Sequence, residues 1–261
     1  LPIISQQFYE DKNQKEQKER VIKSGRQAGD FSFDNETLER MGALQNYYRD
    51  RVCQWIDVPL DEGKAIKSGT SRTRVAEADR VIDEVKALLK AGGDDLSIGV
   101  ITFYAAQREL IMQKLSLISI NETPVTLKRD GEFVIHDDFR WIHKKKPDGT
   151  ISMEERLRVG SVDAFQGKEF DVVILSCVRT LNLQASRLVS GMTDENREKY
   201  LNRQFGFLRL SNRMNVAMSR QRKMLLCIGD ASLVTNSLAD EAIPSLAAFY
   251  KLCGGENGCI R

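Results

Sequence analysis

The sequence has 261 residues, of which 41% are hydrophobic and 29% are charged, values that exclude a disordered or low-complexity chain. A formal net charge of +2 neither requires nor excludes a nucleic acid as partner, so such a site must come from local clustering of charge. No apolar run is long enough to cross a membrane, and five cysteines without disulfide-framework spacing predict an intracellular protein, cytoplasmic or nuclear.

The sequence begins with a polar leader. Residues 1–33 are predicted to be partly disordered, because Glu10–Gly29 carry many Lys, Glu, Gln and Arg residues and little that could be buried. In residues 34–55, apolar and aromatic side chains recur at the spacing of one helical face. This spacing predicts an amphipathic helix that ends at Trp55.

A helix, a strand and a second helix are predicted next. An apolar stripe runs along Ser71–Ala91, and two glycines follow it, as is typical of a helix and its end. Residues 97–103 form an apolar run that predicts a buried strand, and 105–117 predict the following helix. Glu77, on the first helix, fits either a functional residue or a plain helix-face carboxylate.

Residues 121–158 interrupt this alternation. Their apolar and polar residues alternate, and the turns Lys-Arg-Asp-Gly and Pro-Asp-Gly-Thr lie between them, which predicts an inserted β-hairpin element. Within it, Trp141 and Lys144–Lys146 fit either a basic-aromatic nucleic-acid patch or solvated turn residues, and the second interpretation is favoured.

The strongest pattern lies in the last part of the chain. Residues 159–179 join a polar turn to a strand rich in Val, Ile and Leu, and residues 210–230 join a helix to a second such strand. Apolar strands that alternate with helices predict an α/β fold with a parallel sheet flanked by helices. Helices are predicted from Ala231 onward, and the Gly-rich C-terminal end is predicted to be frayed.

Two motifs resemble those of a known family. Residues 161–171 read Ser-Val-Asp-Ala-Phe-Gln-Gly-Lys-Glu-Phe-Asp, and residues 213–222 read Arg-Met-Asn-Val-Ala-Met-Ser-Arg-Gln-Arg. Both resemble the last motifs of superfamily 1 helicases, closest to the group that includes senataxin and the nonsense-mediated-decay helicase. The resemblance implies that residues 1–261 form the second, C-terminal RecA-like domain. The segment Pro2–Tyr9 resembles a family segment that follows Tyr-Arg-Met, so the chain is expected to be a fragment.

The resemblance implies catalytic roles for Arg220 and Gln166. Arg220 is the expected arginine finger, a guanidinium that reaches the γ-phosphate across a domain interface and can contribute roughly 10³ to 10⁵ in rate. A surface Arg in a routine ion pair is the alternative. The expected nucleotide-binding residues are Gly167, whose amide would approach the γ-phosphate, and Glu169, which would accept hydrogen bonds from the ribose. Arg213 would orient this loop or couple it to nucleic acid.

The family also implies single-stranded RNA or DNA as a partner, held by small polar groups at strand ends. Thr102, Ser161 and Asn215 are the matching positions, although helix capping is an alternative for Asn215. Thr102 lies in a segment that resembles the family's Gly-Ile-Ile-Thr-Pro-Tyr-x-x-Gln, with Phe103 in place of the usual Pro.

ATP and Mg²⁺ are the expected cofactors, bound mainly by an N-terminal RecA-like domain, which is the other expected partner. This sequence has no Gly-x-x-x-x-Gly-Lys-Ser/Thr loop and no apolar strand ending in Asp-Glu. The chain is therefore predicted to be the motor half of an ATP-dependent helicase and to be inactive alone. The alternative is a non-catalytic interaction domain that retains the fold. No metal site is predicted, because the histidines and the pair Cys253 and Cys259 lack further ligands nearby.

Overall fold

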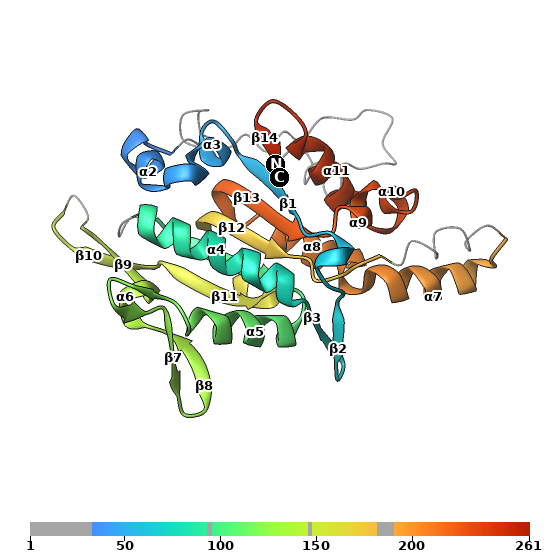
Figure 1. Cartoon of the computed structure of the whole chain (residues 1–261), viewed down its shortest axis with the longest axis horizontal. Helices are drawn as coiled ribbons and strands as arrows, with labels where there is room; N and C mark the ends of the chain where they lie inside the picture. Colours follow the sequence, from blue (N-terminus) through green and yellow to red (C-terminus); the bar gives the residue numbers. More distant parts are fainter. Residues whose placement is uncertain (1–32, 93–95, 146–147, 182–190) are drawn as a thin grey trace.

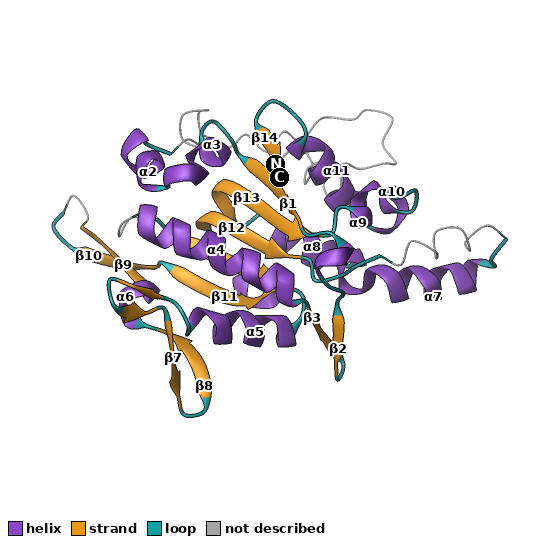
Figure 2. Ribbon diagram, viewed as in Figure 1, coloured by secondary structure: helices purple, strands orange, loops and turns teal. Residues whose placement is uncertain are grey.

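A six-stranded parallel sheet forms the centre of the protein (Figures 1 and 2). The computed structural model describes residues 33–92, 96–145, 148–181 and 191–261. The order of the strands across the sheet is β11 (Leu157–Ser161), β4 (Ile98–Thr102), β12 (Phe170–Ser176), β13 (Gln221–Gly229), β1 (Cys53–Asp57) and β14 (Gly258–Ile260). The predicted α/β class, a parallel sheet flanked by helices, is confirmed.

Helices cover both faces of the sheet (Figure 1). One face packs against α4 (Val75–Ala91) and α5 (Ala105–Leu115), with α2 (Asn35–Arg40), the 3₁₀ helix η3 (Gly42–Leu44) and α3 (Gln45–Tyr48) beside them. The other face carries α7 (Asp194–Phe205), η7 (Gly206–Arg209), α8 (Ser211–Ala217), α9 (Ser232–Thr235), α10 (Ala239–Ala242) and α11 (Pro244–Cys253). Two hydrophobic cores result, one on each side of the sheet.

Strand β12 shows how the sequence builds both cores. All seven of its residues are buried. Because successive side chains of a strand point to opposite faces, Val172 and Ile174 enter the core beneath α4, whereas Val173 and Leu175 enter the other. A run of β-branched and aliphatic residues without polar alternation is what a strand covered on both faces requires.

Two predictions were wrong for segments that form β1 and β14, the last two strands on one side of the sheet. The predicted helix over residues 34–55 ends at Tyr48, and Cys53–Asp57 form strand β1 instead. The Gly-rich C-terminal end is not frayed, because Gly258–Ile260 pair with β1 as strand β14. Both errors have one cause: β1 lies between β13 and β14, and pairing with segments distant in sequence overrides the local pattern. The predicted leader, 1–33, lies outside the described residues except for Phe33, which is buried.

Small hairpins lie outside the main sheet. The hairpin of β2 (Ile66–Ser68) and β3 (Ser71–Thr73) projects beside α7, next to η4 (Leu60–Glu62) (Figure 1). In the range expected for the inserted element, antiparallel pairs are formed by β5 (Ser119–Ile120) with β6 (Thr123–Pro124), β7 (Thr126–Arg129) with β8 (Glu132–Ile135), and β9 (Trp141–Lys145) with β10 (Ile151–Glu155); α6 (Asp137–Arg140) precedes β9.

The expected boundary of this element needs one correction. Leu157 and Arg158, assigned to the insertion, belong to β11, which pairs with β4 in the main sheet. Two further residues of the range, Val125 and Phe139, are buried in the core on the α4 and α5 side. The element is therefore anchored in the domain, and the Lys144–Lys146 side chains lie outside the described part of the chain.

Substitutions at two positions should show, by their effects on the free energy of unfolding, which part of this element is anchored and which part is exposed. Phe139 is 5% exposed, so Phe139→Ala is expected to lower the free energy of unfolding by roughly 3 to 5 kcal/mol. Ile151, in β10, is 68% exposed, so Ile151→Ala should change it by less than about 0.5 kcal/mol. Urea unfolding followed by circular dichroism measures both. Equal, small effects would show that the element packs loosely on the domain.

Candidate functional sites at the two edges of the sheet

The residues of the two motifs meet at the edge of the sheet where β12 and β13 begin. The turn Gln166–Glu169 leads into β12, and Arg220 immediately precedes β13. The amide of Phe170 donates a hydrogen bond of 2.9 Å to the carbonyl oxygen of Arg220, and Phe170 pairs with Gln221. Parallel pairing of two strands from separate motifs therefore brings Glu169 next to Arg220.

The turn is open to solvent. Gln166, Gly167 and Glu169 are all exposed. Gly167 has a φ of +76°, a conformation that L side chains adopt at a cost, and no atom lies within 4 Å of the position that a Cβ would take. The 3₁₀ helix η5 (Val162–Phe165) fixes the start of the turn by burying Phe165. The backbone of Gly167 is thus accessible to a ligand.

The guanidinium of Arg220 is held by its own segment. It donates hydrogen bonds to the carbonyl oxygen of Val216, at 3.1 Å from Nε, and to the hydroxyl of Ser219, at 2.8 Å from Nη2. Across residues 33–92, 96–145, 148–181 and 191–261, no carboxylate forms an ion pair with it. The positive charge of Arg220 therefore has no anionic partner among these residues.

Arg213 and Asn215 lie on α8, which leads toward Arg220. Arg213 forms an ion pair of 3.0 Å with Asp163, and its guanidinium lies 5.6 Å from the ring centre of Phe207. Asn215 is half-buried. The contact to Asp163, which lies in η5, ties α8 to the segment between Ser161 and Gln166.

The predicted nucleic-acid residues Thr102 and Ser161 lie at the opposite edge, where the strands end. Ser161 pairs with Thr102, and Thr102 pairs with Ser176, so one row of hydroxyls crosses β11, β4 and β12. Thr102 is fully buried, and its hydroxyl lies 3.4 Å from the amide of Tyr104, which donates to it. Ser161 is half-buried. Of the two, only Ser161 has accessible surface for a direct contact.

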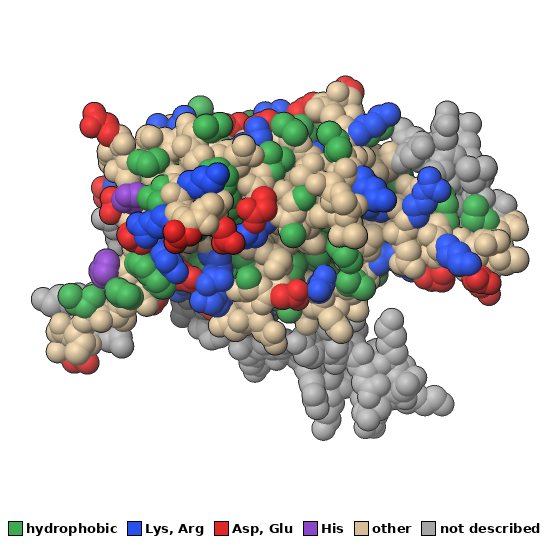
Figure 3. Space-filling model, turned by 90° about the horizontal axis from the view of Figure 1, so that it is seen from below, with side chains coloured by type: hydrophobic (Ala, Val, Ile, Leu, Met, Phe, Trp, Pro, Cys, Tyr) green, Lys and Arg blue, Asp and Glu red, His purple; other side chains and the backbone are tan. Residues whose placement is uncertain are grey.

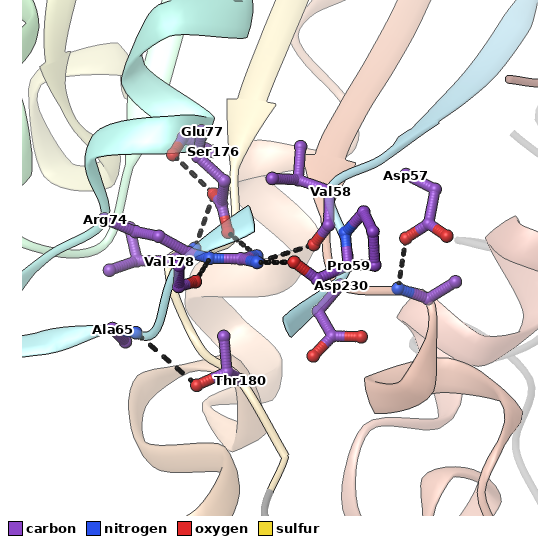
Figure 4. A network of polar contacts seen from close by, with 12 residues as sticks. Asp57, Val58, Pro59, Ala65, Arg74, Glu77, Ser176, Val178, Thr180 and Asp230 are labelled. Carbon is purple, nitrogen blue, oxygen red and sulfur yellow. Dashed lines mark hydrogen bonds and ion pairs between the residues drawn. The ribbon is translucent and has the colours of Figure 1, made fainter. Parts of the chain in front are cut away.

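A buried ion pair, which the sequence indicated only weakly, lies at this second edge (Figure 4). Arg74 is fully buried, and its guanidinium donates to Glu77 at 3.1 Å. It also donates to the carbonyl oxygens of Val58, Pro59 and Gly63 at 2.6, 2.8 and 2.9 Å. Three of these acceptors follow β1, so Arg74 joins the end of β1 to the start of α4. The signal in the sequence was the opposite charges three residues apart at a helix start.

The carboxylate of Glu77 organises the end of β12. It accepts hydrogen bonds from the hydroxyl of Ser176, at 2.8 Å, and from the amide of Val178, at 2.7 Å. Val178 has a φ of +67°, which is unfavourable for a β-branched residue. The bond to Glu77 therefore stabilises a strained backbone directly after the strand, as occurs at functional sites.

Burial raises the pKa of Glu77 from 4.5 to about 7, against the opposing effects of Arg74 and the hydrogen-bond donors. A carboxyl group whose pKa is raised by folding adds stability below about pH 4.5, and this stability is lost as the pH rises through about 7. Over that range, the wild type should lose roughly 3 kcal/mol of unfolding free energy relative to Glu77→Gln. Urea unfolding at each pH measures the difference, with the exposed Glu62→Gln as control. A difference independent of pH would contradict the shift.

The described residues offer neither a metal cluster nor a membrane segment. Within them, no three His, Cys, Asp or Glu side chains gather closely enough to hold a metal ion. None of their helices is both long and apolar enough to traverse a bilayer. Four cysteines are buried, and Cys259 is half-buried in β14. Burial raises the pKa of Cys177 and of Cys227, so these thiols are unreactive core residues.

The chain is similar to proteins of a known family. Residues 2–232 match the AAA domain family. The chain is 28% identical over 199 residues to the 5'-3' DNA helicase ZGRF1 of Mus musculus, covering 73% of this chain and 8% of that protein. It is 32% identical over 180 residues to a Regulator of nonsense transcripts 1 homolog of Neurospora crassa, covering 69% and 12%. The chain thus spans about a tenth of the length of these relatives. It therefore belongs to the AAA domain family, as the C-terminal RecA-like domain of the superfamily 1 helicases related to the nonsense-mediated-decay helicase.

Proposed function

We propose that this domain is the C-terminal motor half of an ATP-dependent helicase that acts inside the cell on single-stranded RNA or DNA. The observation that carries the proposal is the pairing of Phe170 with the Arg220 segment, which places the Gln166–Glu169 turn beside an arginine at one edge of the sheet. ATP would bind between this edge and an N-terminal RecA-like domain, which would supply the phosphate loop and hold Mg²⁺.

The chemistry of the first edge fits a nucleotide. Gly167 offers an accessible backbone amide, and Gln166 is exposed beside it, so both could approach a γ-phosphate. Glu169 is an acceptor suited to ribose hydroxyls rather than to phosphates, which would repel it. Arg220 has no carboxylate partner among the described residues, so its guanidinium is available to the charge that develops during phosphoryl transfer. Arg213 would steady the turn through Asp163.

Nucleic acid would bind at the second edge, where Ser161 supplies an accessible hydroxyl. Thr102 would shape this edge from its buried position. Asn215, half-buried on α8, would couple the Arg220 segment to the nucleic acid. On the face of the molecule that is seen from below the view of Figure 1, Lys and Arg side chains are interspersed with Asp and Glu (Figure 3). Attraction of a polyanion would therefore depend on local groups rather than on a uniformly basic face.

The alternative function, a non-catalytic interaction domain, has no specific observation in its favour.

The isolated chain should show no appreciable ATPase activity. It lacks the loop that cradles the phosphates and the acidic pair that holds the metal, so only part of the catalytic set is present. Phosphate release by the purified 261-residue chain, with and without single-stranded nucleic acid, tests this expectation. Turnover that persists through repeated purification would overturn the two-domain proposal. Restored turnover on adding back the N-terminal domain would exclude the non-catalytic alternative.

A further inference from the structure

A cavity of about 180 Å³ opens at the second edge of the sheet, where β12 ends. Its walls come from the β2–β3 hairpin, from the residues after β12 and from the end of α7, and they contain three arginines and no acidic residue; the lining residues are Ala65, Arg72, Arg179, Thr180, Arg203 and Gln204. Guanidinium groups gathered without carboxylates repel one another, so the cavity is electrostatically suited to an anion.

Two of the three guanidiniums have unused donors. Arg72 and Arg203 form no hydrogen bond or ion pair through their side chains with any residue that the structure describes. Elsewhere on the surface, arginines such as Arg197 and Arg209 pair with glutamates. Burial above all, with the charge of Arg72, lowers the pKa of Arg179, which agrees with crowding of positive charge. The two unpaired groups are thus available to bind a ligand.

The walls of the cavity are fixed in advance. Arg179 donates from Nε to the carbonyl oxygen of Gln204 at 2.7 Å and from Nη2 to that of Arg203, which holds the last turn of α7 against the end of β12. On the facing side, the amide of Ala65 donates to the hydroxyl of Thr180 at 3.5 Å (Figure 4). These contacts hold the backbone of the walls in place before a ligand binds, so that only the Arg72 and Arg203 side chains must become ordered.

The buried ion pair also positions this cavity. Arg72 lies two residues before Arg74, and Arg179 follows Val178, whose amide is held by Glu77. The Arg74–Glu77 contact of 3.1 Å therefore connects the backbone segments that carry Arg72 and Arg179. This gives the buried ion pair a positional role, beyond its contribution to packing.

An exposed aromatic residue adjoins the cavity. Gly206, which has a φ of +54°, packs so closely that a Cβ there would lie 2.9 Å from the Tyr104 hydroxyl and 3.2 Å from the Arg179 guanidinium carbon. The next residue, Phe207, is 40% exposed, and its ring lies 5.3 Å from that of Tyr104. The ring also lies 5.6 Å from the Arg213 guanidinium carbon, and its exposed part, next to Gly206, which packs on Arg179 of the cavity wall, can stack on a base whose phosphate enters the cavity.

We infer that Arg72 and Arg203 bind a backbone phosphate of a single-stranded nucleic acid, while Phe207 stacks on a neighbouring base. This rests on the proposed function and deepens it, because it adds a phosphate site to the edge that carries Ser161. Phe207 favours a nucleic acid over free phosphate, which would use the arginines alone. Phosphate contacts carry no sequence information, so binding should be insensitive to base sequence.

Fluorescence anisotropy of a labelled single strand of about 10 nucleotides, bound by the 261-residue chain over a salt series, tests the inference. The double variant Arg72→Gln/Arg203→Gln should bind on the order of 10-fold more weakly at low salt. It should also reduce the slope of log K against log salt by about 0.7, the contribution of the one phosphate contact that is lost from a single strand. Phe207→Ala should weaken binding roughly 10-fold and leave the slope unchanged, and Phe207→Tyr should restore it.

The matched control is Arg40→Gln/Arg49→Gln, which removes two exposed arginines, one at the end of α2 and one after α3. This variant should keep the affinity and the salt slope of the wild type. Circular dichroism confirms folding of each variant. If the wild type binds but the cavity variant keeps its affinity and slope, the phosphate site is wrong and the proposed function stands. If the wild type binds no single strand, the nucleic-acid part of the proposed function falls as well. A free-phosphate site would be identified instead by two results together. Inorganic phosphate would raise the melting temperature of the wild type, and the Arg72→Gln/Arg203→Gln variant would bind the oligonucleotide with unchanged affinity.

Discussion

Replacing Arg220 by alanine in the full-length protein should lower ATP turnover by roughly 10³ or more while leaving nucleotide affinity nearly unchanged. A guanidinium that acts on the charge developing at the γ-phosphate contributes to the transition state more than to binding. The folded domain should tolerate the change, because the hydrogen bonds of this side chain to the described residues go to Val216 and Ser219 of its own segment. Steady-state phosphate release and equilibrium binding of a labelled nucleotide measure the two quantities separately.

Two further variants make this test specific. Arg220→Lys should also be defective, because an ammonium does not reproduce the planar fork of a guanidinium. Arg197→Ala removes a surface arginine that pairs with Glu241 and should leave turnover unchanged. By contrast, Glu169→Ala should weaken nucleotide affinity, as loss of a ribose contact would. Near wild-type hydrolysis by Arg220→Ala would place the arginine finger elsewhere.

Replacing Arg74 by methionine should lower the free energy of unfolding by roughly 3 to 5 kcal/mol. The substitution fills similar space but leaves Glu77 buried without its cation and deprives the carbonyl groups of Val58 and Pro59 of their donor. Because Glu77 can take up a proton, the loss should be smaller at low pH than at high pH. Urea unfolding at a pH below and a pH above the Glu77 pKa of about 7 measures both effects.

The same helix provides the matched control. Arg80 pairs with Glu62 at 3.2 Å, but its side chain is 46% exposed, so Arg80→Met should cost less than about 1 kcal/mol. The double variant Arg74→Met/Glu77→Gln should recover part of the stability lost by Arg74→Met, because no buried charge is then left unpaired. A cost for Arg74→Met no larger than that for Arg80→Met would show that the pair contributes little.

The sequence alone determined the fold class and the strongest elements. Strands β4, β12 and β13 were predicted because each is a continuous apolar run, a pattern that a parallel sheet covered on both faces requires wherever it lies in the chain. The order of the two motifs, 161–171 and 213–222, likewise identified the family, because both are local in sequence.

Only the tertiary structure decided what depends on pairing and burial. The apolar spacing of residues 34–55 fits a helix, but the helical part ends at Tyr48. Strand β1 begins at Cys53 because β13 and β14, distant in sequence, bond to both of its edges. Thr102 matches a family motif, yet the structure buries its hydroxyl. Arg72 and Arg203 lie on a hairpin and a helix far apart in the chain, and their convergence on one cavity follows from folding, which no local pattern records. Residues within one element can be predicted from its periodicity, whereas contacts between elements depend on the long-range packing that the whole chain determines.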